Sequence, residues 1–249
     1  MLYLIRVPVA IIFFIGVSII GTFAFIFRPF NPDNTRLAAR VYSWGGTRIL
    51  GIKVNVHGLE TTQNMPPSVV VANHQDNLDL FICGAVIPKR TVSVGKKSLL
   101  LIPGFGMLYW LAGNVLIDRK NSKNSKTIMD ASTEALTKGN RSIWVFAEGT
   151  RNKGENILPF KKGAFRMAIE AGVPIVPICV SSYVGRLNLN KLNSGTVNIK
   201  VLEPISTEGL SIKDSSQLMD ECWHKMKQTT DLLDQQKSDQ ILESSTVFE

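Results

Sequence analysis

Cysteine and histidine are scarce in this chain of 249 residues, with three of each. The cysteines, Cys83, Cys179 and Cys222, are an odd and widely spaced set, which does not suit a disulfide framework. The chain also lacks a Cys-x-x-Cys motif or the paired Cys/His spacing of a zinc site. We therefore expect a reducing compartment for the folded domain, three buried thiols, no metal and no bound cofactor.

Acidic residues are outnumbered by basic ones, which gives the chain a formal net charge of +8. A basic balance of this size favours anionic partners, namely a membrane surface, nucleic acid or a phosphorylated substrate. The sequence has no recognisable nucleic-acid module and no aromatic residues interleaved with Lys and Arg on one face. We expect no nucleic-acid partner, and favour membrane lipids and a phosphorylated substrate.

Charge is missing altogether between Val7 and Phe27, a run of 21 residues. As a helix this run would be about 31 Å long, which matches the hydrocarbon core of a bilayer. A cleaved signal peptide is the alternative, but its apolar region is normally shorter and ends in an Ala-x-Ala-like site, whereas this run is followed by Arg28-Pro29. We predict an uncleaved membrane anchor, which either spans the bilayer or dips into one leaflet.

The basic residues that flank this run predict its orientation. Only Arg6 precedes it, and five basic residues follow it closely: Arg28, Arg36, Arg40, Arg48 and Lys53. The positive-inside rule then places the large domain on the cytoplasmic side of the membrane.

The segment Asn34–Leu50 has an amphipathic pattern, with Leu37, Val41 and Trp44 at helical spacing. It is either a helix lying on the membrane or an ordinary surface helix packed on the domain, and Gly45-Gly46 is expected to interrupt it.

Short runs rich in Val and Ile predict strands that are covered on both faces, at Lys53–His57, Ser68–Ala72, Thr91–Val94, Ser142–Ala147, Ile175–Val180 and Thr196–Leu202. Helical patterns alternate with them at Asn77–Val86, Ser122–Lys138, Lys162–Ala171 and Asp214–Gln235. The alternation predicts an α/β class, with a single layered domain at residues 51–235 whose largely parallel or mixed sheet is flanked by helices. Residues 1–50 would hold the membrane helix and the interfacial helix, and residues 236–249 a polar, frayed tail.

His74 stands at a predicted strand-to-helix junction, and Asp79 follows it by five residues. On one straight helix this offset separates two side chains by roughly 140°, so the pair can meet only if His74 precedes the helix and Asp79 lies in its first turn. Asp76 or Asn77 would cap that helix. A carboxylate on one imidazole nitrogen suits a general base that acts on a hydroxyl, although His-x4-Asp alone is a weak pattern.

Three further segments add weight to this pair. They are Gly113-Asn114-Val115-Leu116-Ile117-Asp118-Arg119, Phe146-Ala147-Glu148-Gly149-Thr150-Arg151, and Val173-Pro174-Ile175-Val176-Pro177. A Gly-Thr turn can present donors to an oxyanion, and an arginine can bind a phosphate. Lys96 and Lys97 place two more cations after a predicted strand, which favours a phosphorylated substrate.

In their order and spacing, these four blocks closely resemble the motifs of the 1-acylglycerol-3-phosphate (lysophosphatidic acid) acyltransferases of the glycerolipid acyltransferase family. The stretches Val94–Leu100 and Leu158–Phe165 look like those of the bacterial members. The resemblance covers about residues 50–205, and it implies a transferase of phospholipid biosynthesis in the bacterial inner membrane that faces the cytoplasm. It departs from the family at Asp76, where Ser or Asn is common, and at Ala147, where Pro is common.

The resemblance implies a role for each site residue. His74 would deprotonate the sn-2 hydroxyl of lysophosphatidic acid and Asp79 would orient it, so that the hydroxyl attacks the thioester of acyl-CoA or acyl carrier protein and gives phosphatidic acid. Residues expected to hold the substrate's anionic groups are Glu148, Gly149, Thr150 and Arg151, with Lys96, Lys97 and Arg119 as further candidates. The apolar stretch Leu99–Leu111 would form either part of an acyl-chain groove or core.

Three other functions remain open at this level. A sibling enzyme would acylate glycerol-3-phosphate or another lysophospholipid. A lipid hydrolase would need a serine or cysteine nucleophile, for which the chain has no Gly-x-Ser-x-Gly elbow, and Cys83 lies in an apolar run. A lipid-binding protein with a relic site is the third. His57 and His224 have no partner nearby in sequence and are expected to be structural.

Overall fold

The computed structural model describes residues 1–117 and 133–246, with side chains as far as residue 235. In this part of the chain, seven strands form one sheet in the order β1-β7-β6-β2-β5-β3-β4. Every neighbouring pair is parallel except β6 and β7. The strands are β1 Ile52–His57, β2 Val69–Ala72, β3 Thr91–Lys96, β4 Val115–Ile117, β5 Ser142–Phe146, β6 Ile175–Val180 and β7 Gly195–Val201. The predicted mixed α/β sheet is confirmed, and of these strands only the three-residue β4 was missed.

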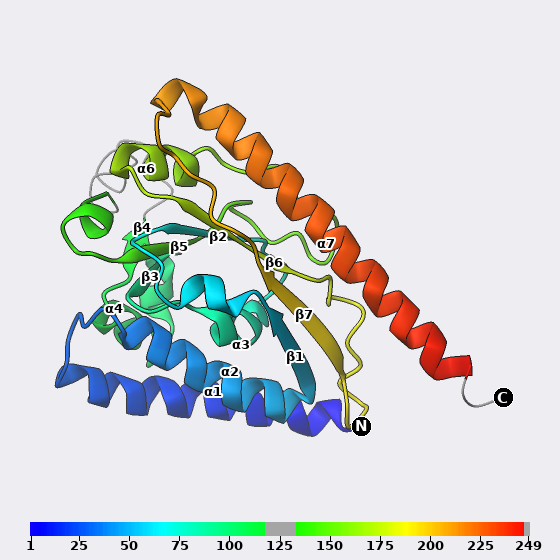
Figure 1. Ribbon diagram of the computed structural model, residues 1–249. Helices are drawn as coiled ribbons and strands as arrows, with labels where there is room; N and C mark the ends of the chain where they lie inside the picture. The colour runs from blue at the N-terminus through cyan, green and yellow to red at the C-terminus, as the bar shows by residue number, and fades with distance from the viewer. Residues whose placement is uncertain (118–132, 247–249) are drawn as a thin grey trace.

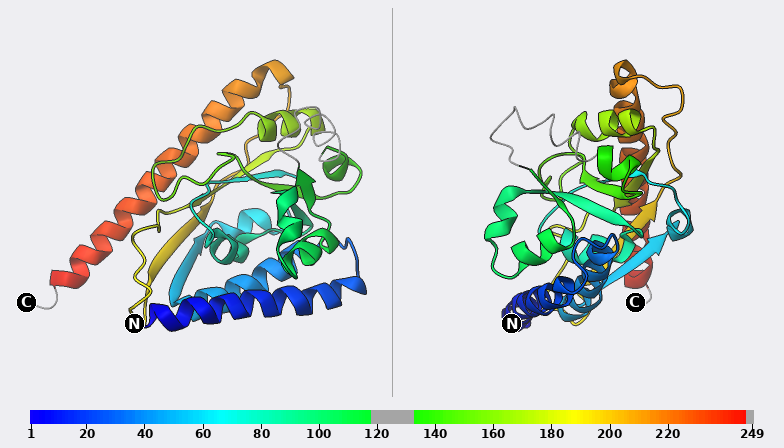
Figure 2. Two further views of the ribbon diagram at one scale, coloured as in Figure 1. Left: turned by 180° about the vertical axis from the view of Figure 1, so that it is seen from behind. Right: turned by 90° about the vertical axis from the view of Figure 1, so that its left-hand side faces the viewer.

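Helices cover both faces of the sheet. Figure 1 shows α1 and α2 side by side below it, with α3 and α4 between them and the strands, and α6 and α7 on the opposite side; Figure 2 shows the same layers from two other directions. The bounds are α1 Tyr3–Ile26, α2 Asn34–Leu50, α3 Asp79–Ile82, α4 Phe105–Leu111, α6 Gly163–Ala171 and α7 Ser215–Thr246. Short 3₁₀ turns include η2 Cys83–Val86 and η3 Lys97–Leu101.

The alternation of side chains along β2 divides the interior into two cores. Val70 and Ala72 pack with the apolar residues of α1 to α4, whereas Val69 and Val71 pack with those of α6 and α7. All four residues are fully buried, as expected for a central parallel strand covered on both faces.

Three helix predictions need correction. The helix expected at Asn77–Val86 is shorter, because α3 begins at Asp79 and continues as the 3₁₀ turn η2. Leu78, rather than Asp76 or Asn77, occupies its N-cap position. The helix α4 lies in a stretch for which no helix was predicted, and α7 extends to Thr246, past the expected end at Gln235. Of the helix predicted at Ser122–Lys138, residues 133–137 are helical and residues 122–132 lie outside the described part.

Gly45 and Gly46 do not interrupt α2, which runs on to Leu50. A Cβ atom at Gly45 would lie 2.2 Å from the Phe13 ring, and one at Gly46 would lie 2.2 Å from the Phe81 ring. The two glycines therefore serve close packing of the helix against its neighbours rather than a break.

The helix α1 is apolar and long enough to cross a membrane, with only 17% of its most apolar window buried. It is nevertheless fastened to the domain at both ends. The guanidinium of Arg6 donates to the carbonyl oxygens of Leu189 and Leu192 at 3.1 and 2.7 Å. Near the other end, the Thr22 hydroxyl donates to the carbonyl oxygen of Gly104 at 3.2 Å. The helix thus lies along the domain instead of projecting from it (Figure 1).

Candidate active site

The loop that follows β2 presents three polar residues in alternating directions. The Asn73 amide both donates to and accepts from the backbone of Val180, at 2.9 and 2.8 Å, and so ties the end of β2 to the end of β6. The Gln75 amide donates to the Ser181 carbonyl oxygen at 2.9 Å. His74, between them, lies in the wall of a cavity on the other side. The hydrogen bonds of Asn73 and Gln75 hold in place the backbone from which the imidazole of His74 projects.

His74 and Asp79 meet as the predicted pair. His74 Nδ1 lies 2.7 Å from Asp79 Oδ2, and since a carboxylate can only accept, Nδ1 carries the proton. The five-residue offset closes because His74 lies in the loop while Asp79 is the first residue of α3. The same Oδ2 accepts the backbone N–H groups of Gln75 and Asp76, at 2.7 and 3.2 Å. This leaves His74 Nε2 as the ring nitrogen that can take a proton.

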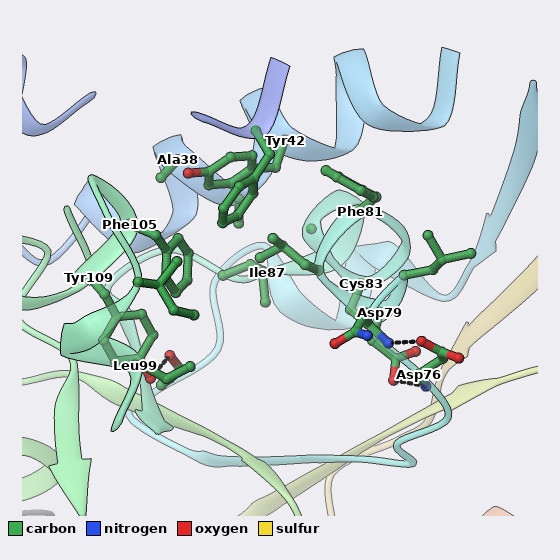
Figure 3. A pocket seen from close by; sticks show the side chains of 18 of the residues that line it. Ala38, Tyr42, Asp76, Asp79, Phe81, Cys83, Ile87, Leu99, Phe105 and Tyr109 are labelled. Carbon is green, nitrogen blue, oxygen red and sulfur yellow. Dashed lines mark hydrogen bonds between the residues drawn. The ribbon is translucent and has the colours of Figure 1, made fainter. Parts of the chain in front are cut away.

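Asp76 takes no part in this pairing through its carboxylate, which accepts the backbone N–H of its neighbour Asn77. Its own backbone N–H supports Asp79 instead. The carboxylate of Asp76 therefore does not compete with Asp79 for the imidazole of His74. Figure 3 shows the Asp76 and Asp79 carboxylates at one side of the cavity.

The imidazole is held against an aromatic ring. His74 stacks on Phe146 with ring centroids 4.0 Å apart and an angle of 14° between the planes. The His74 side chain keeps 19% of its surface exposed, whereas Asp79 keeps 2%. The imidazole is thus accessible from the cavity, while the Asp79 carboxylate is shielded from water.

Glu148 has a position that the sequence did not indicate. Its carboxylate is buried and accepts the backbone N–H groups of His74 and Leu158, at 2.7 and 2.9 Å, and the side-chain amide of Asn152 at 3.3 Å. Burial raises the pKa of this carboxyl group, although the three hydrogen bonds oppose the rise. Among the described residues, Glu148 is not part of the cavity wall. Its contacts fix the backbone of His74 from the side opposite Asn73 and Gln75.

The other residues predicted to hold the substrate's anionic groups do not all lie at the cavity. Arg151 lies in the cavity wall together with His74 and Asp79, and Thr150 is exposed beside it. Gly149 has φ +70°, a left-handed conformation that favours glycine, and a Cβ there would lie 3.3 Å from the Lys161 side chain. Lys96 and Lys97 are exposed at the end of β3, and Arg119 lies outside the described residues.

The cavity has a volume of about 650 Å³ and runs from the His74–Asp79 pair, between the sheet and helices α1 and α2, to α4. Its wall near His74 and Arg151 is polar, but most of its lining is apolar. Figure 3 shows side chains of α2, α3, η3 and α4 pointing into it, namely Ala38, Phe81, Leu99 and Phe105, together with Ile87 from the loop after η2. Leu99 and Phe105 belong to the stretch Leu99–Leu111, which is therefore cavity wall in part as well as core.

Other candidate groups are poorly placed for chemistry. Burial raises the pKa of the Cys83 thiol, as does the nearby charge of Asp79, which makes it a weak nucleophile. His57 and His224 are exposed. Within residues 1–117 and 133–235, no group of three or more His, Cys, Asp or Glu side chains could hold a metal ion.

Sequence reasoning missed three residues that support the pair and a fourth near the Gly149 turn. Asn73 and Gln75 flank His74 in sequence, so their alternation in an extended loop was a usable signal. Tyr183, whose hydroxyl donates to Asp79 Oδ1 at 2.9 Å, is 104 residues away and gave none. Lys161 approaches the Gly149 turn, and its place after a proline-containing loop also gave no indication.

Comparison with known proteins gives consistent results. A family model described as Acyltransferase matches residues 53–181. The 1-acyl-sn-glycerol-3-phosphate acyltransferase of Salmonella typhimurium is 39% identical over 236 residues, 95% of this chain and 96% of that protein. The Escherichia coli protein of the same name is 37% identical over the same shares, and the human alpha protein is 41% identical over 72% of this chain and 64% of its own length.

A solved structure shares the fold. The crystal structure of the 1-acyl-sn-glycerophosphate acyltransferase from Thermotoga maritima superposes with a TM-score of 0.72. The match covers 94% of this chain and 98% of that one at 22% sequence identity, so it speaks for the fold alone.

Proposed function

Since this chain belongs to the acyltransferase family, we propose that it transfers a fatty acyl group from a thioester donor to the sn-2 hydroxyl of 1-acyl-sn-glycerol-3-phosphate. The product would be phosphatidic acid. One observation carries the proposal: the His74–Asp79 pair, Arg151 and many apolar side chains all line one cavity of about 650 Å³. That arrangement matches an acceptor with a hydroxyl, a phosphate and an acyl chain.

The proposed step begins at His74 Nε2, which removes the proton from the sn-2 hydroxyl while Asp79 stabilises the imidazolium through Nδ1. The hydroxyl oxygen attacks the thioester carbonyl carbon, a C–O bond forms and the C–S bond breaks. The imidazolium then returns the proton to the departing thiolate. A thioester is already activated, so this sequence requires no enzyme nucleophile and no metal.

Binding of the substrate's anionic group would fall to the cations at the end of the cavity that holds His74. Arg151 can form the planar, bidentate contact that phosphate favours, and Lys161 is close enough to the Gly149 turn to add a second charge. Glu148 is better understood as a positioning residue than as a phosphate ligand, because its negative carboxylate would repel phosphate and already accepts three protein donors. Lys96 and Lys97 remain candidates for contacts with the donor or with lipid headgroups.

The membrane is the proposed source of both lipid substrate and docking surface. On α2, the residues of the predicted apolar stripe point outwards, with Trp44 61% exposed, while Tyr42 on another face is buried in the domain. Leu101 in η3 is 82% exposed. Because α1 is fastened along the domain, we infer that α1, α2 and η3 lie in one leaflet, on the cytoplasmic face of a bacterial inner membrane, with the cavity open to lipid.

The test is acyl transfer by purified protein in detergent, with lysophosphatidic acid, glycerol-3-phosphate and lysophosphatidylcholine as acceptors and acyl-CoA or acyl carrier protein as donor. We expect transfer to lysophosphatidic acid, and a loss of about 10²–10⁴-fold in kcat for His74→Ala. His57→Ala is the matched control, because His57 is exposed at the end of β1, and it should keep full activity.

Two outcomes would count against the proposal. If glycerol-3-phosphate were the preferred acceptor, the reaction would be that of a sibling acyltransferase. If His74→Ala kept activity within about threefold of the parent, the general-base assignment would be wrong.

A further inference from the structure

We propose that Tyr183 is a positioning residue of the catalytic pair, whose hydroxyl holds Asp79 Oδ1 so that Oδ2 faces His74. This inference rests on the proposed acyl transfer, because it assigns Tyr183 a part in orienting the general base of that reaction. Tyr183 follows β6, in the segment just after the Val-Pro-Ile-Val-Pro block.

The geometry fixes Tyr183 at both of its ends. Its hydroxyl lies 2.9 Å from Asp79 Oδ1, and its backbone N–H donates to the Gln75 side-chain oxygen at 3.0 Å. Gln75 in turn donates its own backbone N–H to Asp79 Oδ2 at 2.7 Å. Tyr183 and Gln75 are thus hydrogen-bonded to each other, and both donate to the Asp79 carboxylate. Tyr183 is almost entirely buried.

A carboxylate side chain can rotate and can exchange its two oxygens, so an orienting carboxylate needs a restraint on each oxygen. Here the oxygens have separate partners: Oδ2 accepts from His74 and from two backbone N–H groups, while Oδ1 accepts from the Tyr183 hydroxyl. Removing the hydroxyl would leave Oδ1 without this partner. The carboxylate could then turn, and the tautomer and orientation of His74 would be less well defined.

The hydroxyl must remain a donor to serve in this way. Burial raises the pKa of Tyr183 well above its ordinary value, and the charge of Asp79 raises it further, so the phenol stays protonated. A hydrogen bond from a neutral donor to a charged carboxylate is stronger than one between neutral groups. Tyr183 therefore also favours the charged form of Asp79, which the imidazolium of His74 requires.

A purely structural role is the alternative, and Tyr183→Phe separates the two because it keeps the ring and removes only the hydroxyl. We expect kcat for acyl transfer to fall about tenfold to a hundredfold, the usual effect of losing a hydrogen bond to a charged group, with KM for donor and acceptor unchanged. Thr207→Val is the matched control, since its buried hydroxyl donates to the Val173 carbonyl oxygen at 3.0 Å, far along the chain from the pair. It should lose similar stability without loss of kcat.

The tautomer of His74 gives a second measurement that does not depend on the substrate. In the structure, the proton on His74 Nδ1 is held by Asp79 Oδ2. Without the Tyr183 hydroxyl the carboxylate could turn, so the hydrogen bond at Nδ1 should weaken and part of the population should carry the proton on Nε2 instead.

NMR of protein labelled with ¹⁵N in its histidine rings distinguishes the two tautomers in detergent, and His74→Ala assigns the signal among the three histidines. A mixture of His74 tautomers together with a reduced kcat supports the inference. An unchanged His74 tautomer in Tyr183→Phe overturns it, whatever reaction the enzyme catalyses. Full kcat in Tyr183→Phe also overturns it. A mixture of tautomers in a protein that does not acylate lysophosphatidic acid would overturn the proposed function and leave the positioning role in place.

Discussion

The two faces of the sheet are built from similar residues but differ in what lies between sheet and helix. On the face covered by α6 and α7, the apolar side chains form a closed core that includes Phe165, Ala168 and Met226. On the face covered by α1 to α4, an equally apolar set of side chains surrounds a cavity of about 650 Å³. The first face is filled and the second is hollow.

The packed face therefore contributes most to the stability of the domain, whereas the candidate site lies on the hollow face. A cavity forfeits the dispersion contacts that a filled core would gain, so the hollow face is less stable per residue than the packed face. The polar residues of the site cluster where the hollow face meets the carboxyl ends of β2 and β5, as expected for an α/β sheet. Substitutions on the two faces should therefore have different consequences.

Truncation of a large side chain should give the largest difference in lost unfolding free energy between the packed face and the hollow face. Phe165→Ala removes a fully buried ring from the packed face, and we expect the free energy of unfolding to fall by about 3–5 kcal/mol. Phe14→Ala, on the hollow face, removes a ring that already borders the cavity, so its loss should be smaller. Denaturant unfolding in detergent measures both, and equal losses would contradict the division between the faces.

Enlargement of a small side chain should give an intermediate difference in unfolding free energy between the two faces. On the hollow face alone it should also change the choice of acyl chain. Ala168→Leu overfills the packed face, which should cost about 1–3 kcal/mol of unfolding free energy and leave the choice of acyl chain unaltered. Ala38→Leu extends into the cavity and should cost less (Figure 3). It should lower activity with the longest acyl chain by about tenfold relative to shorter ones, as for about two buried methylenes at about 0.8 kcal/mol each.

A series of acceptors and donors of increasing chain length measures this selectivity. If Ala38→Leu lowered activity equally for every chain length, the cavity would not be the place where the chain lies. If Ala168→Leu changed the length preference, the packed face would not be independent of the site.

Replacement of an exposed leucine should give the smallest difference. Leu101→Ser should weaken partition into vesicles of phosphatidylethanolamine and phosphatidylglycerol by up to roughly tenfold, because full burial of a leucine is worth about 1.5–3 kcal/mol and only part of it enters the bilayer. Leu232→Ser on α7 is the matched control, since this leucine is 52% exposed on the opposite face. Sedimentation with vesicles measures both, and equal partition of the two variants would show that η3 does not touch the membrane.

Much of the packed face could be predicted from the sequence, because its helices and strands follow local rules. The strand Ile175–Val180 was predicted with both of its ends, and Gly172 ends α6 in the left-handed conformation expected of a C-cap. The hollow face was harder to predict from the sequence. Gly45 and Gly46 were expected to interrupt the helix, because their close contacts with Phe13 and Phe81 leave no sign in the local sequence pattern.

The same limit explains the outcome at the site. His74 and Asp79 are five residues apart, so local geometry was enough to predict that they meet. Glu148 was assigned to substrate from the family resemblance, whereas in the structure its carboxylate accepts the backbone N–H of His74, 74 residues earlier. Tyr183 went unnoticed because its only signal is a contact across the sheet. Pairings within a few residues can be read from sequence, and those that depend on strand order cannot.

The clamp at Arg6 has a consequence for biosynthesis. Arg6 leaves the ribosome 186 residues before Leu192, which is one of its acceptors. At about 5–20 residues per second, roughly 10–40 s pass before this partner is made. During that interval the apolar helix α1 has neither its clamp nor most of the domain against which it packs. A lipid environment would be favourable for so apolar a helix, because it would remove the exposed side chains of α1 from water until the domain is complete.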